Sequence, residues 1–207
     1  MKRIVFDMAA VLFTWKPRQM LMREVPHLAT DEGQAAHWEW LIFQNYMGDW
    51  ADYDRGTVGV PALVQRIASR TALTSADVQT VVDAVPRELQ AIPETVALLH
   101  RLGDAGHELY YLSNMPAPYA DILESGNTFF SRFRDGVFSG RVHHNKPEAG
   151  IFKLAAERFG SAPQDLVFLD DTAANVEAAR ALGWNALQFQ TAAQATQDLQ
   201  ARRWALA

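Results

Sequence analysis

The hydrophobic residues of this chain follow two different patterns. Short apolar runs that end in polar or acidic residues alternate with amphipathic stretches, mostly in the second half of the chain. The short runs predict strands and the amphipathic stretches predict helices. The predicted strands are 4–7, 108–112, 166–169 and 186–189, and the predicted helices are 93–103, 147–159, 173–182 and one after Thr191. Strands that alternate with helices indicate an α/β fold with a doubly wound parallel sheet, Rossmann-like, covered on both faces.

The segment after the first predicted strand has a different character. Residues 15–92 contain no strand-like run, and their aromatic side chains crowd into helical-looking stretches such as 38–50. Residues 74–85 combine a helix-start pattern with apolar residues at helical spacing. We therefore predict a helical cap over 15–92, inserted into a core that is formed by 1–14 and 93–207.

Composition and charge narrow the class of protein further. The chain of 207 residues is 49% hydrophobic and 21% charged, with a net charge of −5, which gives no reason to expect nucleic-acid binding. No window approaches the roughly 18 uninterrupted apolar residues of a membrane helix, so we expect no membrane association. The absence of cysteine excludes disulfides and thiolate chemistry and is compatible with a cytoplasmic protein. Nothing in the sequence sets the oligomeric state.

Four polar segments lie where an open parallel sheet binds its ligands, at the carboxyl ends of strands or the start of a helix. They are Asp7, the pair Ser113-Asn114, Lys146, and the pair Asp170-Asp171. A carboxylate nucleophile, hydrogen-bond donors, a lysine and an acid pair suited to Mg²⁺ form a set for phosphoryl transfer to an aspartate. Each segment alone has a plainer explanation, such as a helix cap or a surface charge.

Together these segments resemble the motifs of the haloacid dehalogenase-like (HAD) hydrolases with a helical C1-type cap. The matching stretches are IVFDMAAVL, YYLSN, KPE followed by IF, and FLDDTAANVEAA, in the order that the family has them. The resemblance implies Mg²⁺-dependent hydrolysis of a small phosphorylated metabolite through an aspartyl-phosphate. By this resemblance Asp7 is the nucleophile, Ser113 and Asn114 bind phosphate, Lys146 anchors charge, and Asp7, Asp170 and Asp171 hold the metal.

Three further residues acquire roles by the same resemblance. The backbone carbonyl of Ala9 is a metal ligand, and Asn175 is a supporting residue that also occurs in bacterial sugar-phosphate phosphatases of the α-glucose-1-phosphate type. Arg55 lies in a segment similar to a cap turn of this family and is a candidate contact for the distal group of a substrate. Two neighbouring histidines, His143 and His144, are weaker candidates, because adjacent residues of a strand point to opposite sides.

The chain departs from the family pattern at Ala9, where phosphatases of this kind usually carry an Asp that serves as general acid and base. Alanine retains the carbonyl and loses the acid, and general acid–base catalysis is worth about 10²–10⁴-fold. Two alternatives follow from this gap. The alternatives to a phosphatase are a 2-haloacid dehalogenase-type hydrolase, which lacks this Asp, and a catalytically weakened binding protein with the same fold. The acid pair at 170–171 favours the phosphatase, because it would repel a carboxylate substrate.

Overall fold

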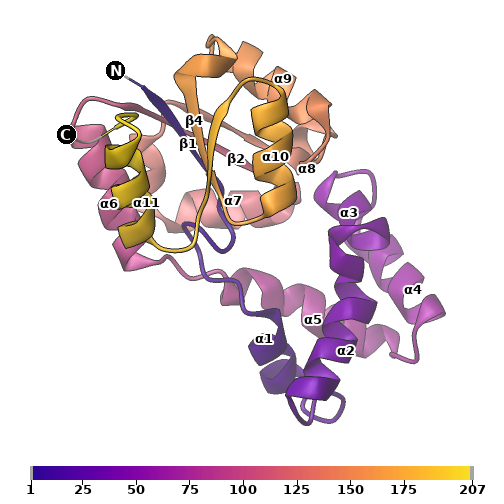
Figure 1. Ribbon diagram of the computed structural model, residues 1–207. Helices are drawn as coiled ribbons and strands as arrows, with labels where there is room; N and C mark the ends of the chain where they lie inside the picture. The colour runs from indigo at the N-terminus through magenta and orange to yellow at the C-terminus, as the bar shows by residue number, and fades with distance from the viewer. Residues whose placement is uncertain (1, 206–207) are drawn as a thin grey trace.

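The computed structural model describes residues 2–205, and a parallel sheet of five strands lies at the centre of one lobe (Figure 1). The strands are β1 (Arg3–Phe6), β2 (Glu108–Ser113), β3 (Asp135–Phe138), β4 (Leu166–Asp170) and β5 (Asn185–Gln188), in the spatial order β3-β2-β1-β4-β5. All neighbouring strands pair in parallel. The prediction of an α/β fold with a doubly wound parallel sheet is confirmed. Strand β3, a short edge strand, was not among the predicted strands.

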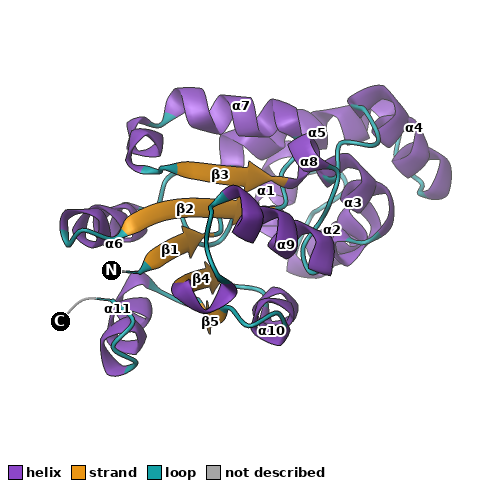
Figure 2. Ribbon diagram, turned by 90° about the horizontal axis from the view of Figure 1, so that it is seen from above, coloured by secondary structure: helices purple, strands orange, loops and turns teal. Residues whose placement is uncertain are grey.

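Helices cover both faces of this sheet, which Figure 2 shows from above. Successive residues of β1 point to opposite faces, so Ile4 and Phe6 enter one hydrophobic cluster and Val5 enters the other. The helices of this lobe are α6 (Pro93–Asp104), α7 (Ala117–Gly126), α8 (Ser139–Val142), α9 (Ala149–Arg158), α10 (Ala173–Ala181) and α11 (Ala192–Ala201). The first cluster contains residues of α6, α7 and α11, and the second contains residues of α9 and α10.

The chain between β1 and α6 forms a second, helical lobe (Figure 1). Its helices are α1 (Pro17–Glu24), α2 (Glu32–Phe43), α3 (Gly48–Asp54), α4 (Val60–Arg70) and α5 (Ser75–Glu88). The two connections between the lobes run side by side, because Thr14 N donates to the Gln90 carbonyl and Ile92 N donates to the Leu12 carbonyl, each at 2.8 Å. We propose this paired crossing as the hinge between the core and the cap.

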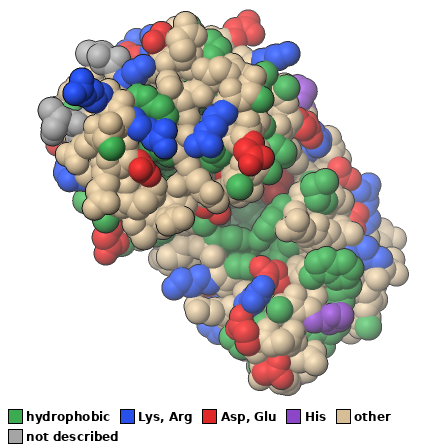
Figure 3. Space-filling model, in the orientation of Figure 1, with side chains coloured by type: hydrophobic (Ala, Val, Ile, Leu, Met, Phe, Trp, Pro, Cys, Tyr) green, Lys and Arg blue, Asp and Glu red, His purple; other side chains and the backbone are tan. Residues whose placement is uncertain are grey.

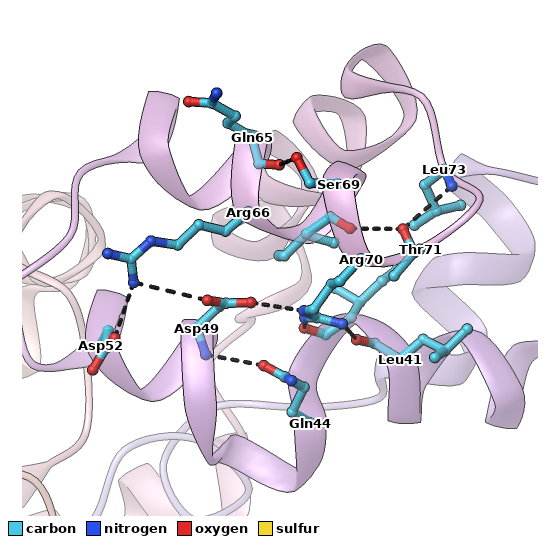
Figure 4. A network of polar contacts seen from close by, with 12 residues as sticks. Leu41, Gln44, Asp49, Asp52, Gln65, Arg66, Ser69, Arg70, Thr71 and Leu73 are labelled. Carbon is cyan, nitrogen blue, oxygen red and sulfur yellow. Dashed lines mark hydrogen bonds and ion pairs between the residues drawn. The ribbon is translucent and has the colours of Figure 1, made fainter.

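Helix α3 is held inside the cap by a network of polar contacts with its neighbours (Figure 4). Arg70 Nε lies 2.7 Å from Asp49 Oδ2, and Arg66 Nη1 lies 3.0 Å from Asp52 Oδ2. The Asp49 amide donates to Gln44 Oε1 at 2.9 Å. The contacts of Asp49 fix the position of α3, whose last residue reaches the space between the lobes, whereas the exposed pair of Asp52 and Arg66 adds little.

Local predictions from the sequence meet different outcomes. Helix α5 begins as expected: Thr74 Oγ1 accepts from the Asp77 amide at 3.1 Å, while the Asp77 carboxylate accepts from the Thr74 amide. The placement of the two histidines in a strand is wrong, since His143 follows the short helix α8 in a left-handed conformation with φ 60°. Within residues 2–205, no helix is long and apolar enough to cross a membrane.

Candidate active site

The predicted chemistry-bearing residues meet at the edge of the sheet that faces the cap. Asp7 directly follows β1, Ser113 ends β2 and Asp170 ends β4. Because β2 and β4 are the two neighbours of β1, their carboxyl ends lie next to Asp7. A cavity of about 410 Å³ lies here, with walls from both lobes. Figure 3 shows a hollow between the lobes, with hydrophobic side chains in its wall.

Lys146 joins two carboxylates at the base of this cavity. Its Nζ lies 2.8 Å from Asp7 Oδ1 and 2.6 Å from Asp170 Oδ2, and it donates to the Leu112 carbonyl at 3.1 Å. All three charged side chains are buried. Burial lowers the pKa of Lys146, but the two carboxylates outweigh it and raise the pKa above its ordinary value. The lysine is therefore a permanent cation beside Asp7.

Asp7 combines a fixed position with an available oxygen. Burial raises the pKa of Asp7 to about 7, Lys146 opposes the rise, and Asp170 adds to it. The Met8 amide donates to Oδ1 at 2.7 Å, and Lys146 approaches the same oxygen. No described residue donates a hydrogen bond to the other oxygen, Oδ2. Asp7 thus has one oxygen that anchors the side chain and a second that is available to a ligand or a reacting atom.

Asp170 differs from Asp7, because protein donors occupy both of its oxygens. Its Oδ1 accepts from the Thr172 amide at 2.8 Å and from Asn175 Nδ2 at 3.1 Å. Its Oδ2 accepts from Lys146 at 2.6 Å and from Asn175 Nδ2 at 3.1 Å. A carboxylate has about four acceptor positions. Asp170 is therefore best placed to orient Lys146, with Asn175 in support.

Ser113, the last residue of β2, and Asn114, which follows it, have separate tasks. The Asn114 side chain holds the backbone of Lys146 from both sides: Oδ1 accepts from the Lys146 amide at 2.7 Å, and Nδ2 donates to its carbonyl at 2.9 Å. Ser113 is buried and lines the cavity, and its hydroxyl has no hydrogen-bond partner among the described residues. Ser113 Oγ is thus free to bind a ligand, whereas the side chain of Asn114 is engaged and only its backbone amide remains.

Three acidic side chains form a group that could hold a metal ion. Asp7, Asp170 and Asp171 each offer an oxygen, and these oxygens lie within 4.8 Å of one another. Burial and the neighbouring Asp170 raise the pKa of Asp171 above its ordinary value. Grouped carboxylate oxygens are the ligands of hard cations such as Mg²⁺. The donor set fits this ion, and Asp171 with Asp7 retains the oxygens to bind it.

Asp54 lines the cavity and is not among the site residues predicted from the sequence. It is the last residue of α3, only 6% exposed, and it lines the same cavity as Asp7 and Ala9. Burial raises its pKa to about 8, against a lowering effect of Lys146. Its sequence signal is weak, because an acid in an Asp-rich cap turn reads as a surface charge. Only the docking of the cap on the core buries it.

Arg55 does not take the position that the sequence suggested. Its guanidinium pairs with Glu148, with Nη1 2.9 Å from Oε2, and it is absent from the described residues that line the cavity. The residue bridges the cap and the core, and its contact with a substrate stays a prediction. His143 is also used structurally, since its Nδ1 lies 3.0 Å from the Arg55 carbonyl.

A buried carboxylate paired with lysine, at the carboxyl edge of a parallel sheet and under a helical lobe, defines a class of α/β hydrolases with an inserted cap. The chain belongs to the haloacid dehalogenase-like hydrolases, whose family model matches residues 1–183. The predicted family membership is confirmed. The cap type and the similarity to sugar-phosphate phosphatases remain predictions.

Relatives with assigned activities include phosphatases. The sesquiterpene phosphatase astK of Aspergillus oryzae is 23% identical over 186 residues, which is 88% of this chain and 86% of that protein. Phosphoglycolate phosphatase of Escherichia coli is 30% identical over 91 residues, 44% of this chain and 36% of that protein. These relatives agree with the prediction of a phosphohydrolase.

Solved structures share the fold at low sequence identity. A HAD family enzyme of Bacteroides thetaiotaomicron, in complex with magnesium and inorganic phosphate, has a TM-score of 0.72 at 20% identity, over 92% of this chain and 95% of that one. The L-2-haloacid dehalogenase of Xanthobacter autotrophicus has a TM-score of 0.66 at 16% identity, over 90% of this chain and 76% of that one. Identities this low show the fold alone.

Proposed function

We propose that this protein is a Mg²⁺-dependent phosphohydrolase that acts on a small phosphorylated substrate through an aspartyl-phosphate on Asp7. The observation that carries the proposal is the Lys146 ammonium, 2.8 Å from Asp7 Oδ1 and 2.6 Å from Asp170 Oδ2, at the base of the cavity between the lobes. A buried cation beside a carboxylate nucleophile is suited to an anionic phosphoryl group. The phosphatases among the relatives support this chemistry.

Each residue at the base of the cavity has a role in this reaction. Asp7 Oδ2 attacks phosphorus, and the bond between phosphorus and the leaving oxygen breaks. Ser113 Oγ and the Asn114 backbone amide donate hydrogen bonds to phosphoryl oxygens. Lys146 offsets the charge that develops on them. Water then hydrolyses the aspartyl-phosphate and releases inorganic phosphate.

Asp7 and Asp171, together with the backbone carbonyl of Ala9, would hold Mg²⁺. The ion would offset the charge that the carboxylates share with the phosphoryl group. Asp170, with its oxygens occupied by protein donors, would act on the metal site only by orienting its neighbours. This assignment revises the sequence-based role of Asp170 as a direct ligand.

The wall of the cavity favours a substrate with an apolar organic group. Above Asp7 the lining is largely aromatic and aliphatic, with Trp15, Tyr46, Met47, Trp50, Val85, Leu89, Met115 and Tyr119. Lys146 is the one cation among the described lining residues, and it already contacts two carboxylates. A carboxylate on the substrate, such as that of phosphoglycolate or of a 2-haloacid, finds no further cation among the described lining residues. An apolar phosphate ester fits this wall better than a sugar phosphate, and astK, a sesquiterpene phosphatase, offers a precedent.

The test is phosphate release from p-nitrophenyl phosphate, farnesyl phosphate, glucose 1-phosphate and phosphoglycolate, each with Mg²⁺ and with a chelator. Halide release from 2-haloacids is measured in parallel. We expect Mg²⁺-dependent phosphate release, with the lowest KM for farnesyl phosphate. Halide release without metal would instead establish a dehalogenase, and the absence of both products would leave a binding protein.

A further inference from the structure

Residue 9 offers only a methyl group at the position where this chemistry needs a proton donor. We propose that Asp54 of the cap is the general acid and base of the reaction. It protonates the leaving oxygen in the first step and removes a proton from the attacking water in the second. This inference rests on the phosphohydrolase function proposed above and assigns a further catalytic residue to that site.

The position of Asp54 is the first observation that supports this role. The side chain is 6% exposed and lines the cavity that also contains Asp7, on the wall contributed by the cap. No described residue donates a hydrogen bond to its carboxyl group. A buried carboxyl without a structural partner costs stability. A group of this kind inside a cavity is therefore a candidate for a functional role.

The second observation is that the backbone around Asp54 is fixed on the core. Three hydrogen bonds join the end of α3 to the segment that follows β3: Ser139 Oγ to the Asp54 carbonyl at 2.6 Å, Asn145 Nδ2 to the Ala51 carbonyl at 2.7 Å, and His143 Nδ1 to the Arg55 carbonyl at 3.0 Å. Asn145 directly precedes Lys146. The same segment thus positions both the lysine beside Asp7 and the cap residue Asp54, which lines the same cavity. Catalytic groups need such fixed geometry.

The protonation state of Asp54 agrees with the role of an acid. Burial raises its pKa to about 8, so the carboxyl group is largely protonated at neutral pH. The other titratable groups around it include Lys146 and three tyrosines, Tyr46, Tyr53 and Tyr119. The pKa of Lys146 is raised despite its burial, and burial raises the pKa of each tyrosine. Asp7 and Asp171 line the same cavity, and burial raises the pKa of each of these carboxyl groups as well.

The two steps balance in atoms and charge. In the first, the bond between Asp7 Oδ2 and phosphorus forms, the bond to the leaving oxygen breaks, and the Asp54 proton moves to that oxygen to give an alcohol. In the second, the Asp54 carboxylate takes a proton from water, and the resulting hydroxide oxygen binds phosphorus. The bond from phosphorus to Asp7 then breaks. Inorganic phosphate leaves, and Asp54 is protonated again.

The experiment compares Asp54→Asn with the wild type on two substrates, p-nitrophenyl phosphate and hexyl phosphate, at saturating Mg²⁺. The nitrophenolate leaves without a proton, whereas the hexanol oxygen needs one. We expect the rate of the acylphosphate-forming step, measured as the pre-steady-state burst of alcohol or nitrophenolate release, to fall on the order of 10²-fold for hexyl phosphate and less than about threefold for p-nitrophenyl phosphate. The loss of activity of the wild type on hexyl phosphate above about pH 8 should disappear in the variant.

Asp52→Asn is the matched control, because Asp52 lies on the same helix and pairs with Arg66 on the surface of the cap (Figure 4). It should leave both rates unchanged. An equal loss on both substrates in Asp54→Asn, or no loss on either, would overturn the role of Asp54 as an acid. A second variant addresses the same point: adding Ala9→Asp to Asp54→Asn should restore hydrolysis of hexyl phosphate at least tenfold.

The failure of this inference can be distinguished from the failure of the proposed function. If the wild type releases phosphate and Asp7→Asn does not, the phosphohydrolase function stands whatever Asp54→Asn does. If the wild type releases no phosphate from any ester, the function fails, and the role of Asp54 fails with it.

Discussion

The buried carboxyl of Asp54 makes the stability of this protein depend on pH in a predictable direction. The group has a pKa of about 8 in the folded protein, against an ordinary value of 3.8. A group whose pKa is raised on folding contributes its full stability below the lower value, and the contribution is lost as pH rises toward the higher one. Replacement by Asn removes this titration and retains the shape and polarity of the protonated side chain.

The magnitude follows from the two pKa values. Between them, each pH unit lowers the free energy of unfolding by about 1.4 kcal/mol. From pH 5 to pH 7, the folded state keeps the proton while the unfolded state has lost it. The stability of Asp54→Asn relative to the wild type should therefore rise by about 3 kcal/mol over this interval.

Urea unfolding of both proteins at pH 5, 6 and 7 measures this difference. The contributions of all other titratable groups are common to the two proteins and cancel in the comparison. Asp52→Asn again serves as the control and should show no change with pH relative to the wild type. Parallel pH profiles for Asp54→Asn and the wild type would refute the reasoning, because they would mean that Asp54 ionises as it does in the unfolded chain.

Three further predictions concern the base of the cavity and the docking of the cap. Asp7→Asn should reduce phosphate release from p-nitrophenyl phosphate to the background rate; activity near that of the wild type would exclude Asp7 as the nucleophile. Lys146→Met leaves Asp7 and Asp170 buried without their cation and should lower the free energy of urea unfolding by about 3–5 kcal/mol; an unchanged midpoint would contradict this. Gly56→Ala should lower kcat/KM more than tenfold on all esters, because φ is +74° and the new Cβ would lie 2.4 Å from the carbonyl oxygen of Gly140 in the core. Gly106→Ala is the control: φ is also positive there, at +86°, but the space around the new Cβ is open, so this variant should retain its activity.

Much of the core was readable from the sequence. Runs such as 109–112 and 166–169 are hydrophobic throughout, because a strand covered on both faces has no polar side. The carboxyl ends of parallel strands lie at one edge of the sheet, so the order of the segments sufficed to bring Asp7, Ser113 and Asp170 together. The strand β3 was missed, because its four residues begin with Asp135-Gly136 and give no clear pattern.

The sequence by itself determined the fold class, the family motifs and the absence of an acid at residue 9, because these depend on local pattern and residue type. The roles of Asp54 and Arg55 depended on the docking of the cap. These two neighbours look alike in sequence as charged residues of a turn. The tertiary structure buries Asp54 in the cavity, whereas Arg55 pairs with Glu148 of the core. Burial and charge pairing across two lobes arise from contacts between distant segments, and a local pattern carries no information about them.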